Sequence, residues 1–302
     1  MKKEIKKYQL LDSKGYGDFS KTFLEIRDFL QNLEFNELKK LDYPWGRWAW
    51  MFSLPYLDKT FIQKISYYKD NHEIVALLTY ESSFGDVYYV IKDGYEFLKA
   101  EMIQHAIDTF DDTNQFRILI PDYDLEMKEI AKSFNLFETD HTEYTYMLDL
   151  NRDLSYELKE GFKVTSLAEE YNLKKYGQCL FQGFNHEGPY EPDEEELNDR
   201  SISLSALGVN LNRNIAIVEP NGDFVSYCGT WYHEGSVGVL LEPVATVPLF
   251  RKMGLGKAAI YEALQRAKDK GAKIAVVGSN QEFYQKLGFT YYFSSHFWKK
   301  IK

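Results

Sequence analysis

The stretch Arg251-Lys252-Met253-Gly254-Leu255-Gly256-Lys257 follows an apolar run ending in Pro248 and opens an amphipathic segment. A strand, a short glycine-bearing turn and a helix start, in this order, place several backbone N–H groups around one anion-sized hollow. Gly254 permits a turn that a side chain would resist, and Gly256 lets a phosphate approach the backbone closely. The stretch therefore predicts a pyrophosphate cradle, with Arg251 and Lys257 adding positive charge at its rim.

The residues after the turn predict a helix over 255–270, because apolar side chains recur at helical spacing and Gly271 is placed to end it. Other phosphate-binding loops fit less well. A Walker A loop needs four residues between its glycines and then Lys-Ser/Thr, which this stretch lacks. The dinucleotide-binding fingerprint needs a third glycine and an acidic residue after the next strand, but the predicted strand 273–277 is followed by Gly278 and Ser279.

With a second element downstream, these residues resemble the GNAT N-acetyltransferase superfamily. The acyl-CoA loop of that family reads Arg/Gln-x-x-Gly-x-Gly/Ala, and Arg251, Gly254 and Gly256 match it. The segment Asn280–Phe289 is similar to the family's helix with a tyrosine followed by Leu-Gly-Phe. Either element alone would be explained by a turn or a helix end. Together they favour an acyl-CoA site over roughly the last third of the chain.

The resemblance implies acetyl-CoA as the acyl donor. Backbone groups at the end of the predicted strand 236–247 would hold the pantetheine and polarise the acyl carbonyl, and the N–H groups of the cradle would hold the pyrophosphate. Asn280 would contact CoA, although its spacing to the tyrosine is shorter than the family's. The implied binding residues are Val244, Ala245, Thr246, Val247, Arg251, Lys252, Met253, Gly254, Leu255, Gly256, Lys257 and Asn280.

Two residues are candidates for proton transfer. Tyr284 aligns with the tyrosine that serves as general acid in many relatives, and a phenol is protonated at neutral pH. The alternative is a buried tyrosine that packs beside Phe283. Glu242 is the first candidate for the base that deprotonates an amine, and the alternative is a charge at a strand edge. Weaker candidates for the base are His233, Glu234 and His186.

The order of predicted elements indicates two tandem GNAT-like domains, each a mixed α/β sheet flanked by helices, at residues 1–155 and 156–302. The second half predicts strands at 162–167, 214–219, 223–233, 236–247, 273–277 and 291–299, helical segments up to about residue 207, a hairpin turn at 220–223 and a helix at 281–287. The first half predicts strands at 74–81, 86–91, 116–120 and 143–150, with helices at 95–110 and 125–134.

The first half lacks the chemical residues of the second. Only Lys92-Asp93-Gly94 joins the strand 86–91 to the following helix, too short a link for a cradle, and Ala131 falls opposite Tyr284. Asn135 stands where the second copy has Gly288, since asparagine tolerates the left-handed conformation. We therefore expect a degenerate domain that binds no CoA in this way. The aromatic residues Trp45, Trp48, Trp50 and Phe52 favour a core or domain interface over a pocket.

The length, net charge and cysteine content of the chain limit the classes of function that it can have. The chain has 302 residues, a net charge of −10 and two cysteines, Cys179 and Cys228. The negative net charge argues against a nucleic-acid partner. The two cysteines are predicted to be small buried residues rather than part of a disulfide framework or a metal site. The segment Met1–Lys7 lacks the apolar core of a signal peptide. The sequence predicts no membrane partner and a cytoplasmic location. It does not predict the oligomeric state.

The resemblance thus implies an N-acetyltransferase that moves an acetyl group from acetyl-CoA to a primary amine of a small molecule or peptide by direct attack. Tandem GNAT-like folds also use other acyl donors, so the acyl group and acceptor stay open. One alternative is an acyl-CoA sensor or partner-binding module without catalysis. A further alternative is that the acidic segment around Asp193 recruits a basic partner, against the simpler interpretation of a solvated helix start.

Overall fold

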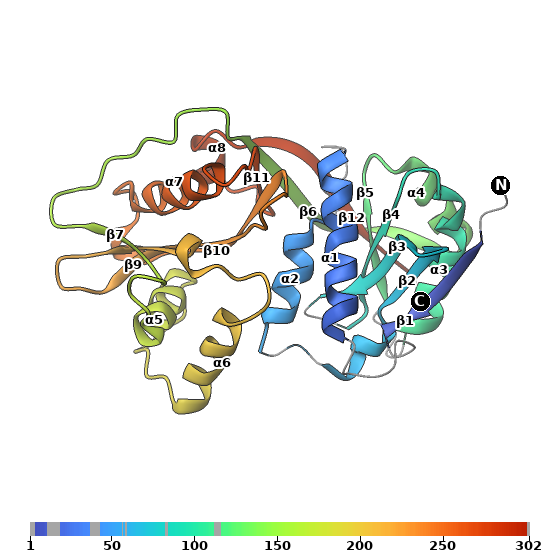
Figure 1. The fold of residues 1–302 in the computed structure, drawn as a ribbon, viewed down its shortest axis with the longest axis horizontal. Helices are drawn as coiled ribbons and strands as arrows, with labels where there is room; N and C mark the ends of the chain where they lie inside the picture. The colour runs from blue at the N-terminus through green and yellow to red at the C-terminus, as the bar shows by residue number, and fades with distance from the viewer. Residues whose placement is uncertain are drawn as a thin grey trace. The chain divides into compact units, whose positions relative to one another are not determined.

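The chain folds into two compact units in the computed structural model, which describes residues 4–10, 19–36, 43–55, 57, 59–81, 84–111 and 116–300 (Figure 1). The first unit takes in the described residues within Met1–Met51, Tyr56–Thr145 and Tyr291–Lys302. The second takes in Phe52–Pro55 and Tyr146–Thr290. Residues 1–3 of the N-terminal segment lie outside the described residues, so the lack of a signal peptide there stays a prediction.

The first unit is built on a sheet with the strand order β1-β2-β3-β4-β5-β12, followed by the N-terminal part of β6. Its strands are β1 (Ile5–Gln9), β2 (Ser66–Asp70), β3 (Glu73–Tyr80), β4 (Asp86–Ile91), β5 (Arg117–Pro121), β6 (Leu136–Asp149) and β12 (Thr290–Lys300). Neighbours are antiparallel from β1 to β4 and between β5 and β12, whereas β4 and β5 are parallel. The sheet is therefore mixed.

Helices with apolar faces accompany this sheet. They are α1 (Phe19–Asn36), α2 (Trp45–Ser53), α3 (Lys99–Phe110) and α4 (Leu125–Ser133), with 3-10 turns at Lys59–Lys64 and Glu96–Leu98. Helix α1 packs against β3, and α3 packs against α4. Trp45 and Trp48 of α2 are buried, with exposed fractions of 1% and 0%. The prediction that this aromatic stretch serves the core is confirmed for these two residues, while Trp50 and Phe52 are half-buried.

The chain passes from the first unit to the second within β6 and returns within β12. The last residues of β6 pair with β11 (Ile274–Val277), in the register Val277↔Tyr146 to Ile274↔Asp149. Strand β12 pairs with β5, in the register Ser295↔Pro121 to Lys299↔Arg117. The two units are thus interleaved along the sequence. The proposed tandem boundary between residues 155 and 156 stays a prediction.

The second unit continues from the end of β6 in the order β11-β10-β9-β8-β7. Its further strands are β7 (Lys163–Ser166), β8 (Ile215–Val218), β9 (Phe224–Trp231) and β10 (Gly238–Thr246). Its helices are α5 (Leu173–Gly183), α6 (Glu194–Leu204), α7 (Leu255–Lys268) and α8 (Glu282–Lys286), with 3-10 turns at Leu211–Arg213 and Pro248–Phe250. Strands β10 and β11 are parallel, and the neighbours from β10 to β7 are antiparallel.

The sheet of the second unit carries a separate apolar cluster on each face. Ile215 and Ile217 of β8 belong to the cluster formed with α7, whereas the alternate residues Ala216 and Val218 belong to the cluster formed with α5. Successive side chains of a strand point to opposite faces, so α7 covers one face and α5 the other (Figure 1). The burial of both faces explains why β8 and β9 are almost continuously apolar.

Most predicted elements are confirmed to within a few residues. Gly222 (φ +95°) forms the turn between β8 and β9, Gly271 (φ +105°) ends α7, and Asn135 adopts the left-handed conformation (φ +58°). The sequence analysis missed β1, β2, α1 and α2, and it began β6 too late. Among the helices of the described residues, none is both long and apolar enough to cross a lipid bilayer.

Candidate active site

The predicted cradle forms a turn in which two residues take the left-handed conformation. After the 3-10 turn Pro248–Phe250, Lys252 has φ +62° and Gly254 has φ +84°. Gly254 also precedes the first residue of α7, and its carbonyl accepts the hydrogen bond of Ala258 N–H. The backbone N–H groups in the first turn of α7 have no carbonyl partner within the helix. The turn thus presents backbone donors at the positive end of a helix dipole.

Gly256 is required for close packing. A Cβ added there would lie 3.0 Å from Cζ of Phe283 and 3.1 Å from Oγ1 of Thr246. The N-terminal turn of α7 therefore lies directly against α8 and the end of β10. The predicted approach of a phosphate to Gly256 stays a prediction, and the structure adds this packing reason for the glycine.

Arg251 is bound within the unit rather than extended at the rim. Its Nε donates to the carbonyl of Thr246 at 3.0 Å, and its Nη2 donates to the carbonyl of Gly183 at 2.8 Å and to Oδ1 of Asn185 at 2.9 Å. These bonds join the loop after β10 to the C-terminal end of α5. The side chain therefore positions the cradle, a role that the sequence interpretation of a rim charge did not foresee.

The pairing of β10 with β11 ends before β10 does, because β11 ends at Val277. Their parallel register runs only from Gly238↔Ile274 to Leu240↔Val276, although β10 continues to Thr246. The register of β10 with β9 shifts between Leu241 and Val244, which indicates a β-bulge. The residues proposed to hold pantetheine, Val244 to Val247, are thus hydrogen-bonded to β9 and lie beyond the last residue of β10 that pairs with β11. We call the stretch of β10 that extends beyond its pairing with β11 the gap, because an extended chain can lie along such a strand edge.

Tyr284 lies on α8, the helix that follows β11. Its side chain is buried, with an exposed fraction of 7%, and it packs edge-on against Phe283 and Phe289. Burial raises the pKa of Tyr284, and electrostatic interactions with Cys228 and Glu242 raise it further. The phenol therefore remains protonated at neutral pH, as a general acid requires.

Glu242 lies in the same neighbourhood, because its charge acts on Tyr284, on Cys228 of β9 and on Tyr176 of α5. Its side chain is half-buried at the bulge of β10, and its carbonyl accepts a hydrogen bond from Nε1 of Trp231 at 3.0 Å. The structure thus brings together the two residues that the sequence analysis selected for proton transfer.

The weaker candidates for the base are placed differently. Glu234 is exposed and forms an ion pair with Lys270 at 3.6 Å. His186 is exposed and its ring stacks on Phe181 at 5.0 Å. His233 is half-buried in the turn between β9 and β10, at the other end of β10 from the cradle. Of the four candidates for the base, Glu242 is the one whose charge acts on Tyr284.

Asn280 is exposed, and its carbonyl accepts a hydrogen bond from Nε2 of Gln285 at 3.2 Å. Its contact with CoA stays a prediction. The two cysteines are buried as predicted, and burial raises the pKa of Cys179 to about 12. Asp193 is the N-cap of α6, where its Oδ1 accepts from Glu196 N–H at 2.8 Å. The interpretation of the acidic segment as a helix start is thus confirmed.

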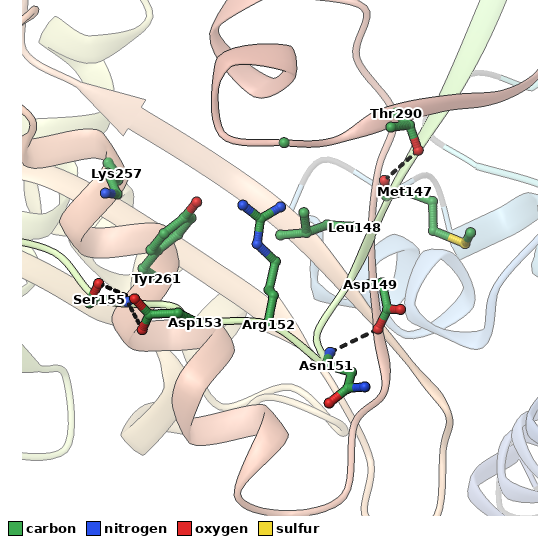
Figure 2. Close-up of a pocket in the computed structure, with 11 residues that line it drawn as sticks. Met147, Leu148, Asp149, Asn151, Arg152, Asp153, Ser155, Lys257, Tyr261 and Thr290 are labelled. Atoms are coloured by element: carbon green, nitrogen blue, oxygen red, sulfur yellow. Dashed lines mark hydrogen bonds between the residues drawn. The ribbon is translucent and has the colours of Figure 1, made fainter.

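A hollow of about 590 Å³ lies next to the cradle and was not foreseen from the sequence (Figure 2). The segment 147–155, the first turns of α7 and residues 288–290 line it. Its most prominent side chains are Arg152, Lys257 and Tyr261. Sequence patterns could not pair Arg152 with these residues, because they lie more than a hundred positions further along the chain.

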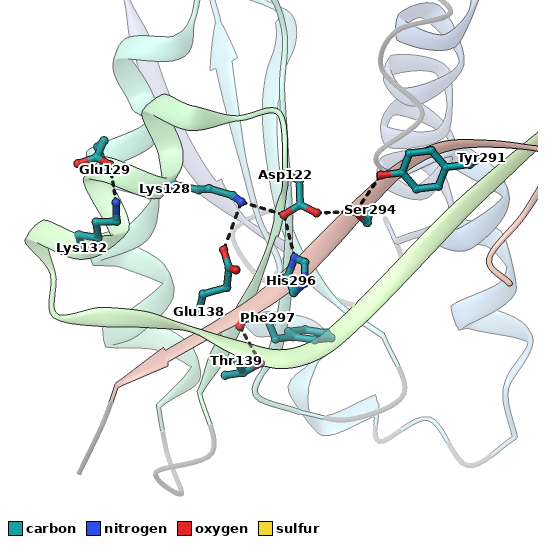
Figure 3. Close-up of polar contacts among 10 residues, drawn as sticks. All are labelled: Asp122, Lys128, Glu129, Lys132, Glu138, Thr139, Tyr291, Ser294, His296 and Phe297. Atoms are coloured by element: carbon teal, nitrogen blue, oxygen red, sulfur yellow. Dashed lines mark hydrogen bonds and ion pairs between the residues drawn. The ribbon is translucent and has the colours of Figure 1, made fainter. Parts of the chain in front are cut away.

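The first unit contains a polar cluster around Asp122 (Figure 3). Its Oδ1 accepts from Nζ of Lys128 and contacts Nδ1 of His296, both at 2.8 Å, and its Oδ2 accepts from Oγ of Ser294. The ligand atoms of Asp122, Glu138 and His296 lie within 4.8 Å of one another, a spacing that suits a metal ion. The ammonium of Lys128 already binds both carboxylates, at 2.8 Å and 3.2 Å, so we interpret the cluster as an ion-pair network.

The cluster gives the stability of the first unit a predictable pH dependence. Burial raises the pKa of Asp122, but hydrogen bonds from Lys128, Ser294 and His296 outweigh it, so the net pKa is lowered. The stabilisation is then present above the unfolded-state pKa and is lost as pH falls through the folded-state pKa. We expect Asp122→Asn to lower the free energy of unfolding by about 1–2 kcal/mol at neutral pH.

This difference should shrink between about pH 5 and about pH 2 in urea unfolding experiments. A control is Asp108→Asn, because the hydrogen bond that Asp108 accepts from Gln104, at 2.8 Å, is exposed. A difference between wild type and Asp122→Asn that stays constant over this range would contradict the assignment of the lowered pKa.

Residues 174–289 match the sequence model of the Acetyltransferase (GNAT) family. The match begins in α5 and ends after α8, so it includes the cradle, Glu242 and Tyr284. A sequence search of curated proteins gives no match.

Solved structures share the fold over nearly the whole chain. A tandem GNAT protein from the clavulanic acid biosynthesis pathway, solved without AcCoA, has a TM-score of 0.63 at 11% identity, covering 98% of each chain. A GNAT-family acetyltransferase from Colwellia psychrerythraea has a TM-score of 0.58 at 13% identity, covering 98% of this chain and 100% of its own. A GCN5-related N-acetyltransferase from Sphaerobacter thermophilus has a TM-score of 0.56 at 10% identity, covering 78% and 79%. At such identities the likeness shows the fold.

Proposed function

We propose that the second unit transfers an acetyl group from acetyl-CoA to a primary amine, because residues 174–289 match the sequence model of the Acetyltransferase (GNAT) family. The observation that carries the proposal is the gap, the stretch of β10 beyond its pairing with β11, which includes Glu242 and precedes the cradle. The charge of Glu242 acts on Tyr284. The residues fit this donor, since the cradle offers backbone N–H groups to a pyrophosphate and the gap offers backbone groups to pantetheine.

In the proposed reaction the amine nitrogen attacks the thioester carbonyl, the new C–N bond forms and the C–S bond breaks. Glu242 accepts the proton that the ammonium form of the acceptor must lose before attack, directly or through a water molecule. Tyr284 donates a proton to the departing thiolate, and the second proton, which the nitrogen loses as the amide forms, restores the phenol directly or through water. Backbone N–H groups at the bulge of β10 stabilise the negative charge that develops on the carbonyl oxygen.

The acceptor is proposed to be an amine of a small molecule or peptide. The net charge of −10 and the half-buried carboxylate of Glu242 favour a substrate that arrives as a cation. A cytoplasmic location is part of the same proposal. The acyl group is proposed as acetyl, the commonest donor among the proteins that the chain resembles.

Calorimetric titration with acetyl-CoA tests the cofactor site. We expect the wild type to bind, and Gly254→Glu to lose binding, because the substitution places a carboxylate beside the pyrophosphate and a side chain at φ +84°. Gly235→Glu is the matched control, since Gly235 also has a positive φ (+102°) and open space around it but lies in the turn before β10. A wild type that binds no acyl-CoA would contradict the proposal.

The second candidate is a sensor that binds acyl-CoA without transferring the acyl group. A sensor needs the cradle but no acid or base, so release of free thiol in the presence of amines discriminates between the two functions. The third candidate, recruitment of a basic protein by residues around Asp193, would show salt-sensitive binding. The role of Asp193 as the N-cap of α6 gives that residue a structural function already.

A further inference from the structure

The loop of residues 184–193, which joins α5 to α6, is folded back onto α5. The ring of His186 stacks on the ring of Phe181, with centroids 5.0 Å apart, and the ring of Tyr190 lies 5.4 Å from the same side chain. A Cβ added to Gly177, in the middle of α5, would lie only 1.9 Å from the hydroxyl oxygen of Tyr190. Tyr190 therefore fills the space that Gly177 leaves on the helix, and the loop is held against α5.

The loop begins at a helix end that fixes the backbone of Asn185. The N–H of Asn185 donates to the carbonyl of Gln182 at 2.9 Å, and the N–H of His186 donates to the carbonyl of Phe181 at 3.1 Å. These two bonds, with Asn185 in the left-handed conformation (φ +61°), form a Schellman motif. Glycine is the usual residue at this position, because a side chain opposes the conformation. The asparagine therefore calls for a role of its side chain.

That role is a hydrogen bond to Arg251 of the cradle. Nη2 of Arg251 donates to Oδ1 of Asn185 at 2.9 Å and to the carbonyl of Gly183 at 2.8 Å. Its Nε donates to the carbonyl of Thr246, the last residue of β10, at 3.0 Å. One guanidinium thus joins the loop, the last residue of α5 and the end of β10. A planar guanidinium suits this position, because its donors point in fixed directions.

The segments that Arg251 joins are also in direct contact. A Cβ added to Gly183 would lie 2.7 Å from Cβ of Ala245 and 3.2 Å from the backbone nitrogen of Thr246. The last turn of α5 therefore lies against the stretch of β10 that is proposed to hold pantetheine. A shift of the loop and of the helix end before it would reach this stretch of β10, and a shift of β10 would reach the loop.

We propose that Arg251 is a positioning residue that clasps the loop 184–193 to the end of β10, so that the position of the loop and the affinity for the acyl donor depend on one another. The inference rests on the proposed function, which has the donor lie along β10 and in the cradle. The guanidinium is committed to Thr246, Gly183 and Asn185 rather than to a phosphate of the donor. Because such coupling is reciprocal, a change in the loop alters donor affinity.

The test is a double-mutant cycle read by calorimetric titration with acetyl-CoA. Asn185→Gly should weaken binding about three- to tenfold, and Arg251→Met about tenfold or more. The double variant should bind as Arg251→Met does, because Asn185 acts through Arg251. Arg251→Lys should also bind more weakly than the wild type, because a compact ammonium lacks the fork that reaches three acceptors.

Asn135→Gly is the matched control. Asn135 also takes the left-handed conformation after a helix (φ +58°), but it follows α4 of the first unit. This variant should bind acetyl-CoA as the wild type does. Thermal melts separate loss of the clasp from loss of the fold, and Asn185→Gly should melt close to the wild type, because glycine suits this helix end.

Four outcomes would overturn the inference. Wild-type affinity in Asn185→Gly would show that the loop and the donor site are not coupled, and additive effects of Asn185→Gly and Arg251→Met would show that the two residues act independently. If Arg251→Lys kept the wild-type affinity that Arg251→Met lost, Arg251 would be a phosphate ligand. These three outcomes leave the proposed function in place. A wild type that binds no acyl-CoA would overturn the proposed function, and the inference with it.

Discussion

Tyr284→Phe should lower kcat by about 10²- to 10⁴-fold, the range typical of a positioned general acid. The affinity for acetyl-CoA should stay unchanged, because the ring that packs against Phe283 and Phe289 is retained. The decrease in kcat is expected because, in the variant, the departing thiolate receives its proton from water. Steady-state kinetics with a responsive amine, read as free-thiol release, measures kcat and KM separately.

Tyr232→Phe is the structural control, because its hydroxyl donates to the carbonyl of Lys270 at 2.9 Å, away from the gap. It should cost about 1 kcal/mol of stability and leave kcat unaltered. Since burial raises the pKa of Tyr284 above its ordinary value of 10, kcat of the wild type should not fall between about pH 8 and about pH 10 through ionisation of this group. Equal kcat for Tyr284→Phe and wild type would favour the sensor.

Arg47→Leu should destabilise the first unit by about 3–5 kcal/mol. Nε and Nη2 of Arg47 donate to the two carboxylate oxygens of Glu81 at 2.6 Å and 2.7 Å, and Nη1 donates to Glu143 at 2.8 Å. Glu81 has an exposed fraction of only 5%. Burial already raises the pKa of Glu81, so removal of the guanidinium leaves a carboxylate that is costly to keep charged.

Urea unfolding of the variant measures this loss. Arg27→Leu is the matched control, because Arg27 pairs at 2.7 Å with Asp28, which is largely exposed, and should cost under about 1 kcal/mol. Adding Glu81→Gln to Arg47→Leu should restore part of the stability, since the unpaired charge is then gone. Equal effects of the two single substitutions would show that the buried pair is not the cause.

The sequence analysis succeeded where local patterns decide the structure. The glycines at 254, 271 and 288 each mark a backbone with positive φ, and such positions are readable from residue type alone. The apolar stripe of α7 and the buried strand β11 follow from periodicity. Tyr284 and Glu242 were selected from the resemblance, and the structure brings them into one neighbourhood.

The sequence did not predict features that depend on contacts between distant segments, such as the position of a side chain or the partner of a strand. Nothing local to Arg251 indicates that its guanidinium reaches the end of α5, and nothing local to Arg152 indicates that it lies over Gly288. Strand β12 shows the same limit, because its apolar pattern predicts a strand but not its partner β5. Pairing partners depend on tertiary packing, which a single sequence does not display.

The return of β12 to the first unit has a consequence for the order of events during synthesis. Residues 4–145 leave the ribosome first, and β5 can then pair with β4, yet it lacks its second neighbour, β12, until residues 291–300 have also emerged. Completion of the first unit's sheet is therefore delayed, with one edge of β5 unpaired, while the intervening 145 residues of 146–290 are made. A pause in translation near residue 290 would prolong the life of this incomplete sheet, and chaperone demand should peak there.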